Sequence, residues 1–199
     1  LRMGGAPEAL PDLLKALLRD KDPVVQGSSA GAMAIFGEEA VEYLVEVIKN
    51  PQSTSIQCGL AKWGLAFIGA EGSKSIKQAA KSKHPLVRAS AIAALGEQIQ
   101  SSNDKDAKNL LENALEDYSH EVQIEAIRLI GVLEEYTWDL DLLASKLKSS
   151  NPDVRKQAAL SLMKTNAKDQ LKTLTSRLNI EKNPEVKLIL KLAIKKLLE

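Results

Sequence analysis

The 199-residue sequence is built from an internal repeat. Its clearest copy runs from Pro85 to Gly96, where the proline is followed by an apolar residue two positions on and by apolar or small residues six, seven and ten positions on. The aligned copies start at residues 23, 54, 85, 120, 152 and 184, so they are 31, 31, 35, 32 and 32 residues apart. A period of this length and regularity predicts stacked helical repeats.

Each copy is expected to begin a helix at its proline position. Proline fixes φ and lacks a backbone N–H donor, so the first turn of a helix tolerates it. In three copies the residue before the proline is Asp22, Asn151 or Asn183, whose side chain can accept hydrogen bonds from free N–H groups of the helix. The six copies together predict about twelve helices and no strand.

Two further features predict where helices end. Gly37, Gly96 and Gly131 follow apolar runs, and we expect each glycine to take the left-handed conformation that caps a helix. Residues 100–104 are polar, so we expect a loop there, which would account for the longer separation of 35 residues.

This pattern resembles the HEAT repeat. Its short, alanine-rich form, in which Pro85 is followed by Val87, Arg88 and Leu95, is similar to the HEAT-like repeats of phycobilisome (phycobilin) lyase proteins. The resemblance covers nearly the whole chain and implies an all-α fold, an α-α superhelix (HEAT-like solenoid) of about six antiparallel helix pairs. The arginine of that family also stands at Arg155, whereas the other copies hold Gln26, Gln57, Gln123 and Lys187.

We expect one repeat domain over residues 1–199. Its repeat units should cover about 7–38, 39–70, 71–102, 103–136, 137–167 and 168–199. Residues 1–5 look like the end of an earlier helix, so we also expect the chain to continue upstream of residue 1.

The charge is unevenly distributed around a net value of +1. Residues 146–199 hold 13 Lys and Arg against 5 Asp and Glu, whereas residues 1–145 hold 14 against 21. The basic third is either a solvated end of the stack or a patch for an acidic protein or nucleic acid. A nucleic-acid site would need basic residues along the concave face and aromatic residues near an acid, and Trp138 beside Asp139 is the one such pairing. Nucleic acid is therefore not expected as a partner.

The remaining composition bounds the environment and the chemistry. The single cysteine, Cys58, excludes an intramolecular disulfide, and we expect it to be a buried, inert thiol. No apolar run approaches the roughly 18 residues that span a bilayer, so we expect a soluble, cytoplasmic protein without a membrane span. No phosphate loop, GxSxG elbow or CxxC pair is present. The step His120-Glu121 is similar to one in HEAT-like deoxyhypusine hydroxylases, but their di-iron site needs several such steps, so we predict no metal site and no cofactor.

If the second helix of each copy lines the concave face, its exposed residues lie five and eight positions after the proline position. The candidate groove residues are Ser28, Gly31, Gly59, Lys62, Ser90, Ala93, Glu125 and Arg128, with Trp63 as a wall. The early copies present small residues that would let a partner approach the backbone, and the later copies present charge. Alternatively, the small residues only allow tight packing between helices.

Two functions fit this sequence. The first is a HEAT-repeat scaffold or adaptor that binds another protein on its concave face. The alternative, implied by the resemblance, is a phycobilin lyase subunit or lyase-like chaperone acting on phycobiliproteins, with a phycobiliprotein or a lyase partner subunit as its partner. In that case Trp63 and Lys62 would contact the bilin. Whether the protein is an enzyme stays open, and no catalytic residue is predicted.

Overall fold

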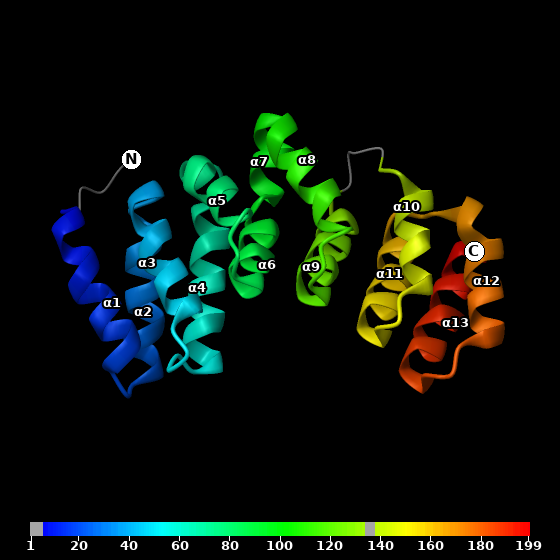
Figure 1. Cartoon of the computed structure of the whole chain (residues 1–199), viewed down its shortest axis with the longest axis horizontal. Helices are drawn as coiled ribbons and strands as arrows, with labels where there is room; N and C mark the ends of the chain where they lie inside the picture. Colours follow the sequence, from blue (N-terminus) through cyan, green and yellow to red (C-terminus); the bar gives the residue numbers. More distant parts are fainter. Residues whose placement is uncertain (1–5, 134–137) are drawn as a thin grey trace. The chain divides into compact units, whose positions relative to one another are not determined.

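The computed structural model describes residues 6–133 and 138–199, which form α-helices and short 3-10 helices but no strand. This confirms the all-α, HEAT-like prediction (Figure 1). The chain divides into two compact units, Leu1–Leu111 and Glu112–Glu199, which are described separately below. The prediction of a single repeat domain stays a prediction. Among the described helices, none is both long enough and apolar enough to cross a membrane.

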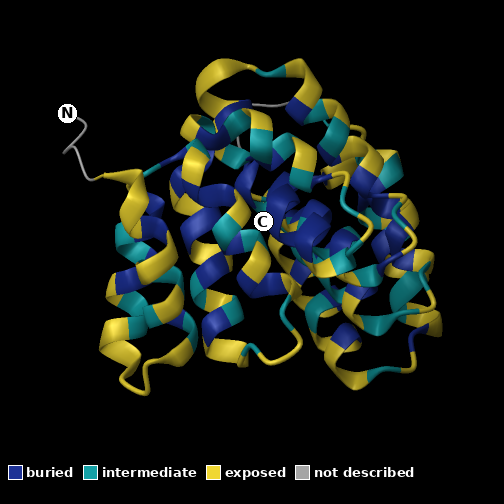
Figure 2. Ribbon diagram, turned by 60° about the vertical axis from the view of Figure 1, so that its left-hand side comes forward, coloured by how far each residue is buried: buried dark blue, intermediate teal, exposed yellow. Residues whose placement is uncertain are grey.

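The first unit contains three helix pairs and an additional helix. Its elements are η1 (Pro7–Ala9), α1 (Leu10–Arg19), α2 (Pro23–Ala34), α3 (Glu38–Lys49), α4 (Ser55–Ile68), η2 (Gly69–Gly72), α5 (Ser73–Ala79), α6 (Pro85–Ala94) and α7 (Gly96–Ser102). Within the pairs, α1 packs on α2, α3 on α4 and α5 on α6. Between pairs, the first helices α1, α3 and α5 pack in one row and the second helices α2, α4 and α6 in another. The buried side chains on the facing sides form the core between these rows (Figure 2).

The second unit repeats this arrangement. After α8 (Lys105–Ala114), which crosses the boundary between the units, it comprises α9 (His120–Ile130), α10 (Leu140–Ser145), η3 (Lys146–Lys148), α11 (Pro152–Lys164), η4 (Lys168–Gln170), α12 (Leu171–Ile180) and α13 (Pro184–Leu198). Here α10 packs on α11 and α12 on α13, while the second helices α9, α11 and α13 pack in a row.

The predicted helix starts are confirmed in five of the six copies. Asp22, Asn151 and Asn183 accept hydrogen bonds from N–H groups in the first turns of α2, α11 and α13. Thr54 caps α4 by a capping box, in which its side chain accepts from the Gln57 N–H and the Gln57 side chain accepts from the Thr54 N–H. The first helical residue of that copy is thus Ser55, one position later than the sequence alignment assumes.

The predicted glycine caps are only partly correct. Gly37 has a positive φ of 61°, but its ψ of −126° lies outside the left-handed helical region and it is the N-cap of α3, whereas α2 ends at Ile35. Gly69 also has a positive φ, 48°, which was not predicted. Gly131 has an ordinary helical φ of −69°, and Gly96 is the first residue of α7, so neither is a left-handed cap. Gly131 is needed for another reason: a Cβ there would stand 2.5 Å from Ser161 Oγ and 3.0 Å from Ser161 Cα on the neighbouring α11.

The predicted polar loop at residues 100–104 is wrong over residues 100–102, because Gly96–Ser102 form α7, and only Asn103 and Asp104 lie between α7 and α8. Ile99 and Gln98 are buried, and the Gln98 side chain accepts a hydrogen bond from Ser73 Oγ at 3.1 Å and donates one to Gly69 O at 3.3 Å. These contacts hold the short helix against η2. The additional helix, rather than a loop, accounts for the longer separation between the third and fourth copies.

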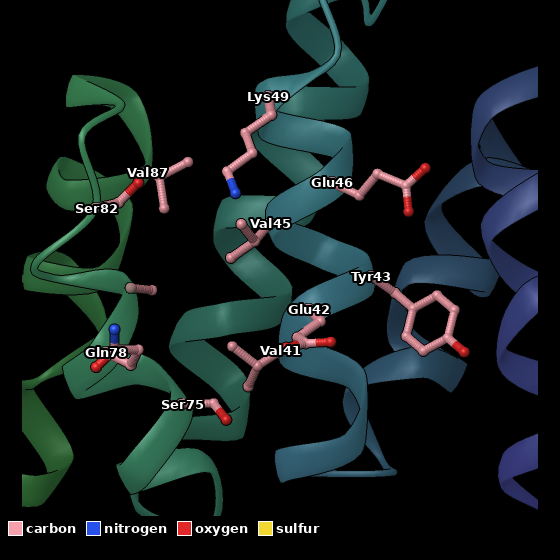
Figure 3. Close-up of a pocket in the computed structure, with 11 residues that line it drawn as sticks. Val41, Glu42, Tyr43, Val45, Glu46, Lys49, Ser75, Gln78, Ser82 and Val87 are labelled. Atoms are coloured by element: carbon pink, nitrogen blue, oxygen red, sulfur yellow. The ribbon is translucent and has the colours of Figure 1, made fainter.

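A hollow of about 540 Å³ lies between α3 and α5 (Figure 3). It forms because α5 has seven residues and α3 has twelve, so the C-terminal part of α3 extends past its neighbour. Val45 and Lys49 point into this space, and Tyr43 is also a lining residue, although its ring is directed to the other side of α3. Glu42 and Glu46 are also among the residues that line the hollow.

The family's arginine position has a local structural role. The side chain four positions after the N-cap donates to the carbonyl six residues before it: Arg155 Nη1 to Ser149 O at 2.9 Å, and in the same way Arg88 to Ser82 O, Gln26 to Asp20 O and Gln123 to Asp117 O. Glutamine thus replaces arginine in satisfying a carbonyl of the turn before the helix.

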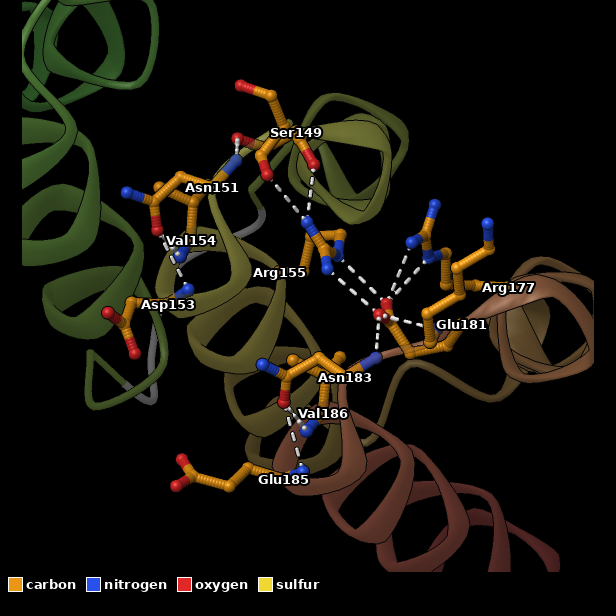
Figure 4. A network of polar contacts seen from close by, with 12 residues as sticks. Ser149, Asn151, Asp153, Val154, Arg155, Arg177, Glu181, Asn183, Glu185 and Val186 are labelled. Carbon is orange, nitrogen blue, oxygen red and sulfur yellow. Dashed lines mark hydrogen bonds and ion pairs between the residues drawn. The ribbon is translucent and has the colours of Figure 1, made fainter.

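In the second unit, Arg155 also forms a buried ion pair (Figure 4). Its Nε and Nη2 donate to the two oxygens of Glu181 at 2.8 Å, and Arg177 also pairs with Glu181 at 2.8 Å. The hydrogen bonds from Arg155, supported by the Asn183 N–H and by Arg177, lower the pKa of Glu181 to about 2. Because the Glu181 side chain is fully buried, this pair connects the last two repeats of the unit.

Candidate functional site

Counting from the N-cap residues Asp22, Thr54 and His84 aligns the second helices of the first unit. The count places Gly31 of α2, Trp63 of α4 and Ala93 of α6 at equivalent positions. The predicted candidates Gly59 and Lys62 each lie one position before the equivalents of Ser28 and Gly31, because that copy begins at Ser55.

Large apolar side chains are exposed along these three helices. Besides Val25 of α2, which is 37% exposed, they are Val24 of α2 and Ile35 at its C-cap, Ile56, Trp63 and Phe67 of α4, and Leu86 of α6. The exposed fractions of these six side chains range from 39% for Leu86 to 72% for Val24. We call this set the apolar face. Because α4 packs against both α2 and α6, the residues of the apolar face lie on neighbouring helices of one compact unit. Scattered single apolar side chains are normal on a protein surface, but several large ones on three adjacent helices indicate a candidate binding site.

Trp63 lies at the centre of this face. Its ring faces α2 at Gly31, with two ring carbons 3.8 and 3.9 Å from the point where a Cβ would stand on that glycine. Its other neighbour is Phe67, one turn further along α4, with ring centroids 5.5 Å apart and ring planes tilted by 33°. Half of the Trp63 surface remains exposed. The two rings thus form a half-open aromatic pair rather than a core cluster.

Lys62 and Gly59 adjoin the aromatic pair on α4, and both are exposed. Apart from its own helix, no described atom lies within 4 Å of the point where a Cβ would stand on Gly59. Lys62 makes no ion pair or hydrogen bond with any residue that the structure describes. The edge of the apolar face therefore carries an available cation beside an uncovered stretch of backbone.

The other candidates in the first unit differ in their accessibility. Ser28 is exposed, and Gly31 and Ala93 are half-buried. Ser90 is only 3% exposed, and its Oγ donates to Leu86 O at 2.6 Å, so it does not line an accessible surface. Cys58 is half-buried rather than fully buried.

Glu125 and Arg128 belong to the second unit. They lie one turn apart on α9 and bind each other, with the Arg128 Nε and Nη2 both 2.7 Å from Glu125 Oε2. Their charges are thus mutually neutralised within α9. No other residue of the candidate set lies in this unit.

Phe67, Ile35, Val24, Ile56 and Leu86 were missed by the sequence analysis. Phe67 could have been found, since it lies four residues after Trp63 and therefore on the same side of the helix. Val24, Ile56 and Leu86 each stand two residues after an N-cap, a position where an apolar residue gives no sign of whether it is buried.

Comparisons with known proteins agree with this fold. The sequence pattern of HEAT repeats matches residues 107–195. Among solved structures, an engineered protein of the Northeast Structural Genomics Consortium superposes with a TM-score of 0.54 at 20% identity, covering 94% of this chain and 96% of the other. Computationally designed armadillo repeat proteins for modular peptide recognition superpose with a TM-score of 0.53 at 19% identity, covering 94% and 99%. The class of protein is therefore a helical repeat protein of the HEAT type.

A sequence relative defines the family more narrowly. The bilin biosynthesis protein MpeU of Synechococcus sp. (strain WH8020) is 40% identical over 212 residues, which cover 90% of this chain and 71% of MpeU. The chain belongs to the HEAT-repeat family that includes MpeU. This confirms the resemblance to the HEAT-like repeats of phycobilisome lyase proteins.

Proposed function

We propose that this protein binds a bilin on the apolar face of its first unit and acts as a phycobilin lyase subunit or lyase-like chaperone. The half-exposed aromatic pair of Trp63 and Phe67 is the observation that carries the proposal. The family relationship to a bilin biosynthesis protein supplies the class of ligand.

The chemistry of a bilin suits this surface. A bilin is a flat, conjugated, open-chain tetrapyrrole with two propionate groups. The rings of Trp63 and Phe67 offer an apolar surface for the tetrapyrrole plane. Lys62 can pair with a propionate, and the uncovered backbone at Gly59 allows close approach. Each of these features lies on α4.

The hollow between α3 and α5 suits a bilin less well. It has room for a ligand of that size, since typical ligand pockets hold about 300–1,000 Å³. However, the residues that line it include two acids, Glu42 and Glu46, beside the one cation Lys49, and they provide no aromatic pair for the tetrapyrrole plane. Ser75, which also lines it, is already bonded to Glu38 at 2.5 Å.

We assign the apolar face a role in binding and presenting the pigment, and we assign no acid, base or nucleophile. Among the described residues, no group of three or more His, Cys, Asp or Glu could hold a metal ion. The adaptor hypothesis remains a second candidate, favoured by the spread of the apolar face over three helices, which is broader than the aromatic pair alone.

The proposal is tested by titrating the protein with a free phycobilin and following the pigment's absorbance. We expect a saturable red shift, and we expect Trp63→Ala to weaken binding by on the order of tenfold through loss of buried apolar contact. Tyr118→Ala is the matched control, because it removes an exposed aromatic side chain from the second unit. The helical circular dichroism of each variant must equal that of the wild type.

Two results would contradict the proposal. One is the absence of any spectral shift with the unmodified protein, alone or together with a phycobiliprotein. The other is a shift that a folded Trp63→Ala variant and the Tyr118→Ala control retain equally.

A further inference from the structure

The start of each second helix in the first unit carries an exposed apolar residue. These residues are Val24, Ile56 and Leu86, each two positions after the N-cap of α2, α4 or α6. We call this row the N-terminal rim. Since the three helices pack side by side, the rim is one row along the edge of the apolar face.

The second unit holds acids at the same position. Glu121, Asp153 and Glu185 each stand two positions after the N-caps of α9, α11 and α13. An acid there is favoured by the partial positive charge at a helix N-terminus. In contrast, the first turns of α2, α4 and α6 contain no acid. The first unit thus replaces residues that stabilise the helix with apolar side chains that gain nothing from exposure to water.

We propose that the N-terminal rim docks a helix of the protein that carries or receives the bilin, and that this helix presents apolar residues flanked by carboxylates. The identity of the partner rests on the proposed function. The apolar contacts would bury the rim, and a carboxylate would complement the N-terminus of α6, because α2 and α4 are already capped by the side chains of Asp22 and Thr54. At α6, the N-cap residue His84 makes no side-chain hydrogen bond to the first turn of the helix.

The dimensions of the rim fit such a helix. Packed helices lie about 8–10 Å apart, so a row over three helices spans roughly 16–20 Å. A helix of about three turns covers this distance at 1.5 Å per residue. Along α4, Ile56 precedes Trp63 by seven residues, or about 10 Å. A partner on the rim would therefore hold its own surface next to a pigment bound at the aromatic pair.

Charge substitutions at the rim test the proposal. The probe is a phycobiliprotein subunit without its bilin, with binding measured by calorimetry. We expect Val24→Glu/Ile56→Glu to weaken binding by about tenfold or more, because it removes the apolar contact and repels carboxylates. Val24→Lys/Ile56→Lys removes the same contact but attracts carboxylates, so it should lose less. The glutamate variant should keep its fold, since the second unit carries acids at this position.

Ile180→Glu/Leu188→Glu is the matched control, because it changes two exposed apolar residues of the second unit, and it should bind the subunit like the wild type. No binding of the subunit by the wild type would overturn the proposal, as would full binding by the glutamate variant or an equal loss in the control. Equal losses of affinity in the lysine and glutamate variants would overturn the proposal that the partner helix carries carboxylates beside its apolar residues. If the wild type binds the subunit through the rim but causes no shift in bilin absorbance, the proposed function is contradicted and the docking role of the rim is supported.

Discussion

Trp63 lies against Gly31 of the neighbouring helix, with two ring carbons 3.8 and 3.9 Å from the point where a Cβ would stand on that glycine. This spacing is an ordinary van der Waals contact and leaves room for a methyl group. The contact with the Trp63 ring therefore does not require glycine at position 31.

We expect Gly31→Ala to leave bilin binding unchanged. The substitution should stabilise the protein by up to about 1 kcal/mol, since glycine inside a helix loses more conformational entropy than alanine. Chemical denaturation of both proteins measures the change. A clear loss of stability would contradict the spacing between the ring and α2.

Gly131→Ala should have the opposite effect. Its new methyl group would stand 2.5 Å from Ser161 Oγ and 3.0 Å from the Ser161 backbone, so α9 and α11 would have to separate. Overpacking of this kind costs about 1–3 kcal/mol. Adding Ser161→Ala should not restore stability, because the Ser161 Cβ and Cα lie within 3.0 Å as well. Full recovery in the double variant would show that only the hydroxyl is in the way.

Glu181→Gln should destabilise the second unit in a pH-dependent manner. Removing the carboxylate leaves the buried Arg155 without its ion-pair partner, a loss of about 3–5 kcal/mol for buried pairs. The pKa of Glu181 is lowered from 4.5 to about 2, so its contribution is complete above pH 4.5 and is lost as the pH falls through about 2. Urea unfolding at a series of pH values should show the two proteins converging in acid. A difference that is independent of pH would contradict the assignment.

Most of the fold could be predicted because its determinants are local. A proline preceded by Asp22, Asn151 or Asn183 sets the start of a helix through contacts within four residues. The second copy has no such proline, and Gln57 serves both the capping box and the carbonyls of Leu17 and Leu18, so its register could not be read from spacing alone.

What could not be predicted depends on contacts between distant residues. The sequence of α7 is mostly polar and so predicts a loop. The burial of Ile99 and Gln98 becomes evident only from their packing against η2 in the structure. Likewise, the sequence pattern predicts that Ser90 is exposed, whereas in the structure its hydroxyl donates a hydrogen bond to Leu86 O. The sequence pattern predicts that Gly131 caps a helix, whereas in the structure glycine is needed there because Ser161 of the neighbouring helix leaves no room for a Cβ.

Lys62 should contribute to pigment affinity through charge. We expect Lys62→Glu to weaken bilin binding by about tenfold, because it places a carboxylate beside a propionate, whereas Lys62→Arg should retain most of the affinity. Added salt should reduce the difference between the wild type and Lys62→Glu, since the site is exposed. Identical titrations for both variants would remove Lys62 from the site.

The location of the pigment is measured most directly by the fluorescence of Trp63. Trp138 is the second of two tryptophans in the chain, so Trp138→Phe leaves Trp63 as the single indole emitter. If the bilin lies against the aromatic pair, its addition should quench this emission in a saturable manner, with the same midpoint as the absorbance titration. If the bilin absorbance shifts while the Trp63 emission stays constant, the bilin binds elsewhere on the protein. That result would contradict the proposed site.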